Sequence, residues 1–91
     1  MSATQILQLA EQTLADRGEE YDSTNGERSG VKVAAAFSAI TGKSITAAEV
    51  YLLLQLVKDA RQWSRPRYHE DSAIDCVAYA ALKAEALDAN E

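Results

Sequence analysis

The sequence predicts an all-α fold, a small four-helix bundle, and three observations lead to this prediction. Apolar residues recur at helical spacing in four segments, and the alternating pattern of a half-buried strand is absent. Two pairs of residues have the spacing of a capping box, which opens a helix. The only proline, Pro66, lies between two of the four segments, where it interrupts no helix.

Length and composition are those of a single globular domain over residues 1–91. The chain is 47% hydrophobic and 25% charged, and its formal net charge is −5. Duplex nucleic acids and anionic membranes attract Lys and Arg, so neither is an expected partner of an acidic chain. No apolar run reaches the roughly 20 residues that cross a bilayer, and the N-terminus lacks the pattern of a secretory signal. We therefore expect a soluble protein of the cytoplasm.

The first helix is expected to begin after Ser2 and to end at Gly18. Ser2 and Gln5 form the first capping box, in which each side chain bonds the backbone N–H of the other residue. Gly18 is a residue type that ends helices in the left-handed conformation. The apolar stripe of this helix comprises Ile6, Leu7, Ala10, Thr13 and Leu14.

Residues 18–30 are expected to form a polar loop that contains three glycines. Loops of this length are uncommon in compact domains and are often functional or disordered. Tyr21 is the only large apolar side chain in the loop and is expected to fix it to the core. Two interpretations are open: an ordinary surface loop, or a segment that orders over a ligand with Arg17 and Tyr21 at its stem.

The third helix is expected to run from a second capping box, Thr46 and Glu49, to Trp63. Between residues 50 and 57 it is apolar almost all round, with Gln55 as the exception. Such a helix is buried among several neighbours or lies at a subunit interface. We expect a homo-oligomer formed through this helix. The candidate interface residues are Leu52, Leu53 and Leu56.

The second and fourth helices are expected over residues 31–41 and from about residue 69 to residue 87. Gly42 ends the second helix, and Glu70 and Asp71 complement the positive end of the fourth helix dipole. The second helix has Val33, Phe37 and Ile40 on one face. The expected core stripe of the fourth helix comprises Ile74, Val77, Ala81 and Leu82.

Charged residues gather where the third and fourth helices join. Lys58 and Arg61 share one face of the third helix, and Asp71 and Asp75 share one face of the fourth. The short connector around Pro66 favours antiparallel packing, so the two cations are expected to face the two carboxylates. The simpler interpretation is a set of ordinary salt bridges. The alternative is that the cations hold a phosphate group, while the carboxylates orient them or hold magnesium through water.

Three other reactive residue types are assigned to structure rather than to chemistry. His69 is expected to begin the fourth helix rather than to bind a metal. Cys76, the only cysteine, cannot form an internal disulfide and is expected to be a small buried hydrophobe. Trp63 is expected to pack rather than to stack on a ligand. No residue is assigned a catalytic or metal-binding role.

A series of short, different motifs lies along residues 16–85. The motifs are Arg17-Gly18 with Tyr21, Phe37, Gly42, Ile45-Thr46-Ala47-Ala48-Glu49-Val50, Lys58-Asp59-Ala60-Arg61, His69-Glu70-Asp71-Ser72-Ala73-Ile74-Asp75 and Ala78-Tyr79-Ala80-Ala81-Leu82. Together they resemble a group of short, uncharacterised phage and prophage proteins. That group is distantly similar to the all-α nucleoside triphosphate pyrophosphohydrolases, the MazG-like superfamily.

The resemblance implies a helical bundle that assembles through its long helices and handles a nucleotide. In the superfamily, acidic residues on paired helices bind magnesium, which carries the triphosphate and positions the attacking water. Asp71 and Asp75 match the later acidic pair. The Glu-Glu-x-x-Glu motif of the earlier helix is absent, because Val50 and apolar residues follow Glu49. No cofactor is therefore assigned, although magnesium is compatible with the later pair.

Three classes of function are open at this point. The absent acidic motif favours a phage-type nucleotide-binding protein without strong catalysis, one that captures a host nucleotide signal in evasion of host defence. The second class is a small magnesium-dependent nucleotide pyrophosphatase, with missing acids supplied by a neighbouring subunit. The third is a protein-binding inhibitor of a host enzyme. The candidate ligand-binding residues are Lys58, Arg61, Asp71, Asp75, Arg17 and Tyr21.

Overall fold

The structure, a computed structural model of the chain, describes residues 1–20 and 29–89. These residues form four helices, α1 (Ala3–Glu20), α2 (Ser29–Thr41), α3 (Ala47–Trp63) and α4 (Glu70–Ala89). None of the described residues belongs to a strand, so the prediction of an all-α fold is confirmed. Within the same two ranges, no helix is long and apolar enough to cross a membrane.

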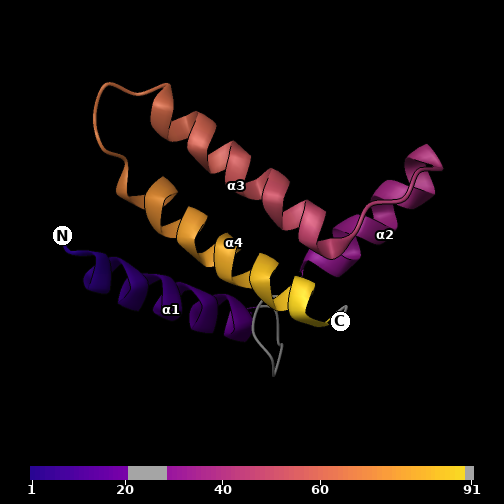
Figure 1. Cartoon of the computed structure of the whole chain (residues 1–91), viewed down its shortest axis with the longest axis horizontal. Helices are drawn as coiled ribbons and strands as arrows, with labels where there is room; N and C mark the ends of the chain where they lie inside the picture. The colour runs from indigo at the N-terminus through magenta and orange to yellow at the C-terminus, as the bar shows by residue number, and fades with distance from the viewer. Residues whose placement is uncertain (21–28, 90–91) are drawn as a thin grey trace.

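Three of the helices form a layer, and the remaining helix projects from it. α4 lies between α1 and α3 and packs against both, while α2 packs only against α3 among the described elements (Figure 1). The Cα radius of gyration is 13.9 Å, against about 12 Å for a compact domain of this length. The bundle is therefore open, and α2 projects from it beside the N-terminal end of α3 (Figure 1).

Both predicted capping boxes are present. The Ser2 N–H donates to Gln5 Oε1 at 2.7 Å, and the Gln5 N–H donates to Ser2 Oγ at 3.2 Å. The Thr46 N–H donates to Glu49 Oε1 at 2.9 Å, and the Glu49 N–H donates to Thr46 Oγ1 at 3.1 Å. The bond from the Thr46 backbone is the main cause that lowers the pKa of Glu49. These local bonds fix where α1 and α3 begin.

The ends of α1, α2 and α4 differ from the prediction. α1 continues through Gly18 to Glu20, so the predicted stop at Gly18 is wrong. A glycine near a helix end costs only about 1 kcal/mol, and the contact of Arg17 with α4 holds the last turns in place. α2 begins at Ser29, and α4 continues beyond residue 87 to Ala89. The remainder of the predicted loop, which includes Tyr21, lies outside the described residues.

The core of the described residues is small, and three of its seven members are alanines. The buried apolar residues are Ala10, Ala48, Val50, Tyr51, Ile74, Ala78 and Leu82. Leu14 and Val77 pack against the part of this core that lies between α1 and α4. Small residues allow α1 and α4 to approach closely, but they bury little apolar area.

Several residues of the predicted stripes lie outside this core. Leu7 is 60% exposed, and Ala81 is exposed while Ala78 takes its place. The predicted stripe of α2 is also exposed; its members are Val33, Phe37 and Ile40. The reason is that α4 has neighbours on two opposite sides, α1 and α3, whereas the apolar faces of α1 and α2 are only partly covered.

Candidate functional site

One carboxylate, that of Asp75, lies between two cations from two other helices. Asp75 Oδ1 accepts a hydrogen bond from Arg17 Nη2 at 3.0 Å, and Asp75 Oδ2 lies 2.9 Å from Lys58 Nζ. The three side chains are mostly buried, with 22%, 16% and 17% exposure for Arg17, Lys58 and Asp75. Arg17, Lys58 and Asp75 are called the Asp75 cluster below. Because α4 lies between α1 and α3, this cluster ties the three helices together (Figure 1).

The local sequence explains why each member of the cluster is where it is. Arg17 lies in the last turn of α1, where a cation complements the negative end of the helix dipole. Lys58 lies two turns after Tyr51 on the face of α3 that packs against α4. The connector after α3 then reverses the chain, so that α4 runs antiparallel to α3 with Asp75 beside Lys58.

Two tyrosine rings extend the cluster towards α2. The guanidinium of Arg17 lies over the ring of Tyr79, 5.2 Å from its centroid, which is a cation–π contact. The ring of Tyr79 stacks with that of Tyr51, with centroids 6.3 Å apart and 26° between the planes. Tyr51 is buried and its hydroxyl oxygen accepts a hydrogen bond from the Gly30 N–H at 3.1 Å. Contacts therefore run without a break from α1 to the first turn of α2.

Gly30 is required by this close approach. Its N–H is among the first four of a helix, which have no partner within the helix, and the Tyr51 hydroxyl supplies one. A Cβ at position 30 would lie 2.5 Å from Tyr51 Cζ, which is shorter than real carbon contacts. The sequence does not signal this pairing, since the two residues come from different helices.

The cluster carries an excess of positive charge and an unused donor. Two cations and one carboxylate give a formal charge of +1. Nη1 of Arg17 is buried and has no hydrogen-bond partner in the part of the chain that the structure describes. A buried donor without an acceptor is costly, and a charged one attracts an anionic acceptor. An anion beside Nη1 would supply the missing acceptor.

The other predicted ligand-binding residues lie outside the cluster. Arg61 and Asp71 are both exposed, and no ion pair joins either of them to another described residue. The face of α3 centred on Tyr51 and Lys58 turns towards α4 and leaves Arg61 exposed at its edge. Tyr21 lies outside the described residues.

His69 directly precedes α4, close to its predicted place, and its carbonyl accepts a hydrogen bond from the Ala73 N–H at 3.2 Å. Its N–H donates to Gln62 Oε1 at 2.8 Å, and its Nδ1 lies 2.6 Å from the hydroxyl of the buried Ser72. Gln62 also donates from Nε2 to the carbonyl of Arg67 at 3.0 Å. These bonds hold the connector between α3 and α4 and so fix how the two helices pair.

Cys76 and Trp63 differ from their predictions. Cys76 is only half-buried, and its thiol donates to Asp59 Oδ1 at 3.5 Å. Burial, followed by the charge of Asp59, raises the pKa of this thiol. Trp63 is 85% exposed, so it packs against nothing substantial within its own chain.

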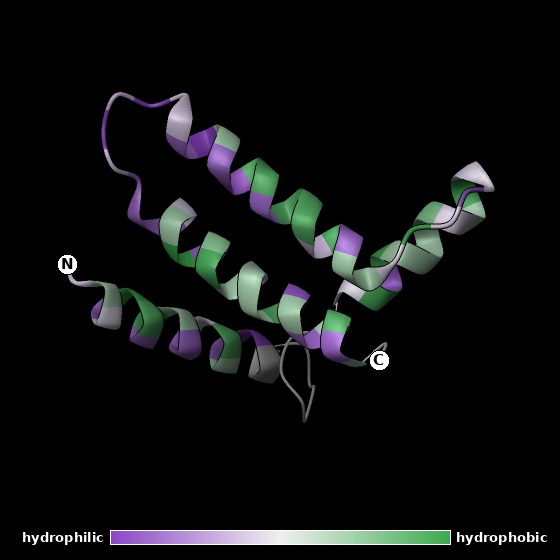
Figure 2. Ribbon diagram, viewed as in Figure 1, coloured by the Kyte–Doolittle hydropathy of each residue, from purple (hydrophilic) through white to green (hydrophobic). Residues whose placement is uncertain are grey.

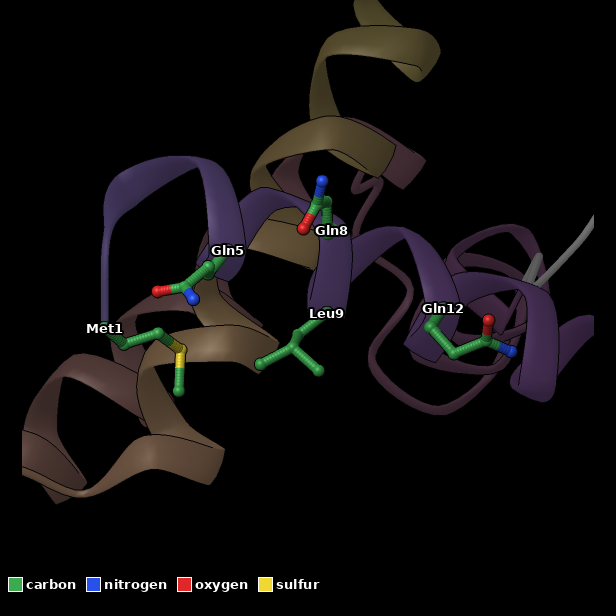
Figure 3. Close-up of a pocket in the computed structure, with 5 residues that line it drawn as sticks. All are labelled: Met1, Gln5, Gln8, Leu9 and Gln12. Carbon is green, nitrogen blue, oxygen red and sulfur yellow. The ribbon is translucent and has the colours of Figure 1, made fainter.

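The described residues outside the cluster offer no metal site, and α1 carries an open depression. Among residues 1–20 and 29–89, no three His, Cys, Asp or Glu side chains lie close enough together to hold a metal ion. An open depression runs along α1 (Figure 3), where Leu9 and Gln8 project in opposite directions. It is lined by Met1, Gln5, Gln8, Leu9 and Gln12. All five are exposed and none is charged.

Comparison with known proteins gives a family but no activity. The model of a family described as a domain of unknown function, DUF6378, matches residues 5–87. Searches of curated proteins and of solved structures found no match. The matched range contains all four helices apart from the ends of α1 and α4. The chain therefore belongs to the DUF6378 family of uncharacterised domains.

Proposed function

We propose that this protein binds a phosphorylated small molecule, a nucleotide, at the Asp75 cluster and does so without strong catalysis. The observation that carries the proposal is the buried Nη1 of Arg17, a charged donor with no acceptor among the described residues. It lies in a cluster whose formal charge is +1, so an anion would satisfy the donor and balance the charge together.

Each residue of the cluster has a defined part in this proposal. Arg17 donates from Nη1 to a phosphate oxygen, and Lys58 contributes N–H donors that are not directed at Asp75. Asp75 positions both cations through its two oxygens. Tyr79 holds the plane of the guanidinium from one side. Arg61, exposed one turn further along α3, would contact a second phosphate group.

The choice of a nucleotide over other phosphate esters rests on the sequence resemblance to short phage proteins and to the MazG-like superfamily. The same resemblance leads us to propose a phage origin, capture of a host nucleotide signal, and action in the cytoplasm of the host cell. Hydrolysis assisted by magnesium and inhibition of a host enzyme are the alternatives that the following experiment separates from binding.

The proposal is tested by identifying what the protein binds. Small molecules released by heating the purified protein are analysed by mass spectrometry, and linear and cyclic nucleotides are then titrated in a calorimeter. A phosphorylated ligand is expected in both. The variant Arg17→Ala should lose about 1.5–3 kcal/mol of binding free energy, the range for a hydrogen bond to a charged group.

Two variants complete the test. Arg65→Ala is the matched control, because Arg65 is exposed in the connector, and it should bind as the unaltered protein does. Asp75→Asn is assayed with magnesium for release of pyrophosphate from nucleoside triphosphates: turnover in the unaltered protein that this variant loses would favour the hydrolase. Absence of binding to every nucleotide in the panel would contradict the proposal and favour an inhibitor.

We also propose that the protein self-associates through α3. The support is that the candidate interface residues of the sequence, Leu52, Leu53 and Leu56, are all exposed in the single chain. Leucines on a soluble protein surface, when they are contiguous, commonly mark an interface.

A further inference from the structure

α3 presents a mixed face to its own chain, with Ala48, Val50 and Tyr51 buried, and an apolar face to the outside. The face towards α4 includes Gln55 and Lys58, whereas four apolar residues on the opposite face are 44–52% exposed. These four are Leu52, Leu53, Leu56 and Val57, and they are called the α3 seam below. Trp63, 85% exposed, extends the α3 seam by two turns. Figure 2 shows that both hydrophobic (green) and hydrophilic (purple) residues occur along α3.

The exposed area of the chain is larger than that of a folded monomer of its mass. The accessible surface is 6386 Å² for 9.9 kDa, whereas monomeric proteins of this mass expose about 5,200 Å². The excess is about 1,200 Å² per chain. A stable protein–protein interface buries about 800 Å² per partner, and permanent homodimers bury more. The excess is comparable with the area that each partner covers in such an interface.

The spacing of the α3 seam is symmetric along the helix. Leu52 and Val57 are equally far from the midpoint between residues 54 and 55, and so are Leu53 and Leu56. In a two-fold symmetric dimer, each residue meets the partner's copy of the residue it pairs with. An antiparallel pair of α3 helices crossing at that midpoint would place every residue of the α3 seam against another apolar residue.

The charges that flank the α3 seam favour the same arrangement. Glu49 lies before the seam and Arg61 after it, both exposed and almost equally far from the midpoint. Antiparallel pairing brings Glu49 near the partner's Arg61 on both sides of the axis. Parallel pairing would instead bring like charges together, which is unfavourable.

We infer that the partner on the α3 seam is a second copy of this chain, whose α3 packs antiparallel across a two-fold axis between residues 54 and 55. Leu53 then lies against the partner's Leu56, and Trp63 lies beside the start of the partner's α3. This inference rests on the self-association proposed above, and not on the proposed ligand. It specifies the orientation and the register of the contact.

A mixing experiment with two charged variants tests the register. Leu53→Glu and Leu56→Lys each place a charge against a leucine twice in the dimer, and each should raise the dimer dissociation constant about 100-fold. Mixed in equal amounts, the two variants should form a heterodimer. On one side of the two-fold axis, the carboxylate at position 53 meets the ammonium at position 56 of the partner. On the other side, Leu56 meets the partner's Leu53. One variant is uniformly labelled with ¹⁵N, so that native mass spectrometry distinguishes the heterodimer from both homodimers by its mass.

The controls separate folding, register and self-association. Since residues 53 and 56 are exposed in one chain, circular dichroism of both variants should show the helix content of the unaltered protein. Leu7→Glu, on the exposed surface of α1, should leave the dimer intact. An unaltered protein that is a monomer at every concentration overturns self-association itself. A dimer that Leu53→Glu weakens but that mixing does not restore overturns the antiparallel register alone.

Discussion

The two faces of α3 differ in what covers them. The face that its own chain covers is mixed: Ala48, Val50 and Tyr51 are buried, and an ion pair of Lys58 crosses to α4. The opposite face carries leucines and a tryptophan that the chain leaves exposed. In most domains the apolar face of a helix is covered by its own chain. The difference is the basis of the two proposals above, a ligand at the Asp75 cluster and a second copy on the α3 seam.

The largest expected effect on stability comes from removing the negative charge of the Asp75 cluster. Asp75→Asn keeps the size of the side chain but leaves Arg17 and Lys58, both mostly buried, without their shared anion. Removing one partner of a buried ion pair costs about 3–5 kcal/mol. Because each side chain is partly exposed, we expect a loss of about 3 kcal/mol in the free energy of unfolding by urea.

The control for this prediction is Asp71→Asn, one turn earlier on the same helix. Asp71 is exposed and makes no ion pair with another described residue, so its replacement should change stability by less than about 0.5 kcal/mol. Equal effects of the two substitutions would mean that the Asp75 cluster contributes nothing specific to the fold.

A second, smaller effect is expected where α2 meets α3. Gly30→Ala places a Cβ 2.5 Å from the ring of Tyr51 and disturbs the bond from the Gly30 N–H to its hydroxyl. Overpacking of this kind costs about 1–3 kcal/mol. In a helix, alanine is otherwise more stable than glycine by up to about 1 kcal/mol. A net loss of stability would therefore show that the contact with Tyr51 outweighs this gain. Thermal unfolding should show a lower midpoint, and an unchanged or higher one would contradict the contact.

The smallest effect concerns the thiol at the edge of the α3–α4 interface. Burial and Asp59 raise the pKa of Cys76, so the fraction of reactive thiolate near pH 8 is small. Asp59→Asn removes one of these two causes and should lower that pKa. Alkylation by iodoacetamide at pH 8 should then be roughly two- to threefold faster.

The matched control for the thiol is Asp88→Asn, since Asp88 is exposed near the end of α4. This variant should react at the rate of the unaltered protein. If Asp59→Asn also reacts at that rate over the whole range from pH 7 to pH 10, Asp59 has no influence on Cys76.

The features that the sequence predicted correctly are local ones. The capping boxes at Ser2 and Thr46 involve residues three positions apart, so their spacing is sufficient. The proximity of Lys58 to Asp75 follows from the helical period and the short connector. The connector leaves only one way for α3 and α4 to pair, which is why a contact between two helices could be predicted.

The features that could not be predicted depend on how the helices are rotated. The bond between Arg17 and Asp75 joins residues that are 58 positions apart, and no periodicity indicates it; Arg17 became a candidate only through the resemblance. Leu7, by contrast, belongs to a helical stripe but is exposed, because α1 has α4 alone as a described neighbour. The number of neighbours around a helix decides which part of a stripe is buried.

The central claim, that the apolar face of α3 is covered by a second copy, is tested most directly by the fluorescence of Trp63. This residue is the only tryptophan of the chain and is 85% exposed in a single copy. Emission and sedimentation are measured on the same samples of unaltered protein over a wide range of concentrations. We predict twice the 9.9 kDa of one chain with blue-shifted emission at high concentration, and a red shift as dilution dissociates the dimer. A mass of one chain with solvent-exposed emission at every concentration would contradict the claim.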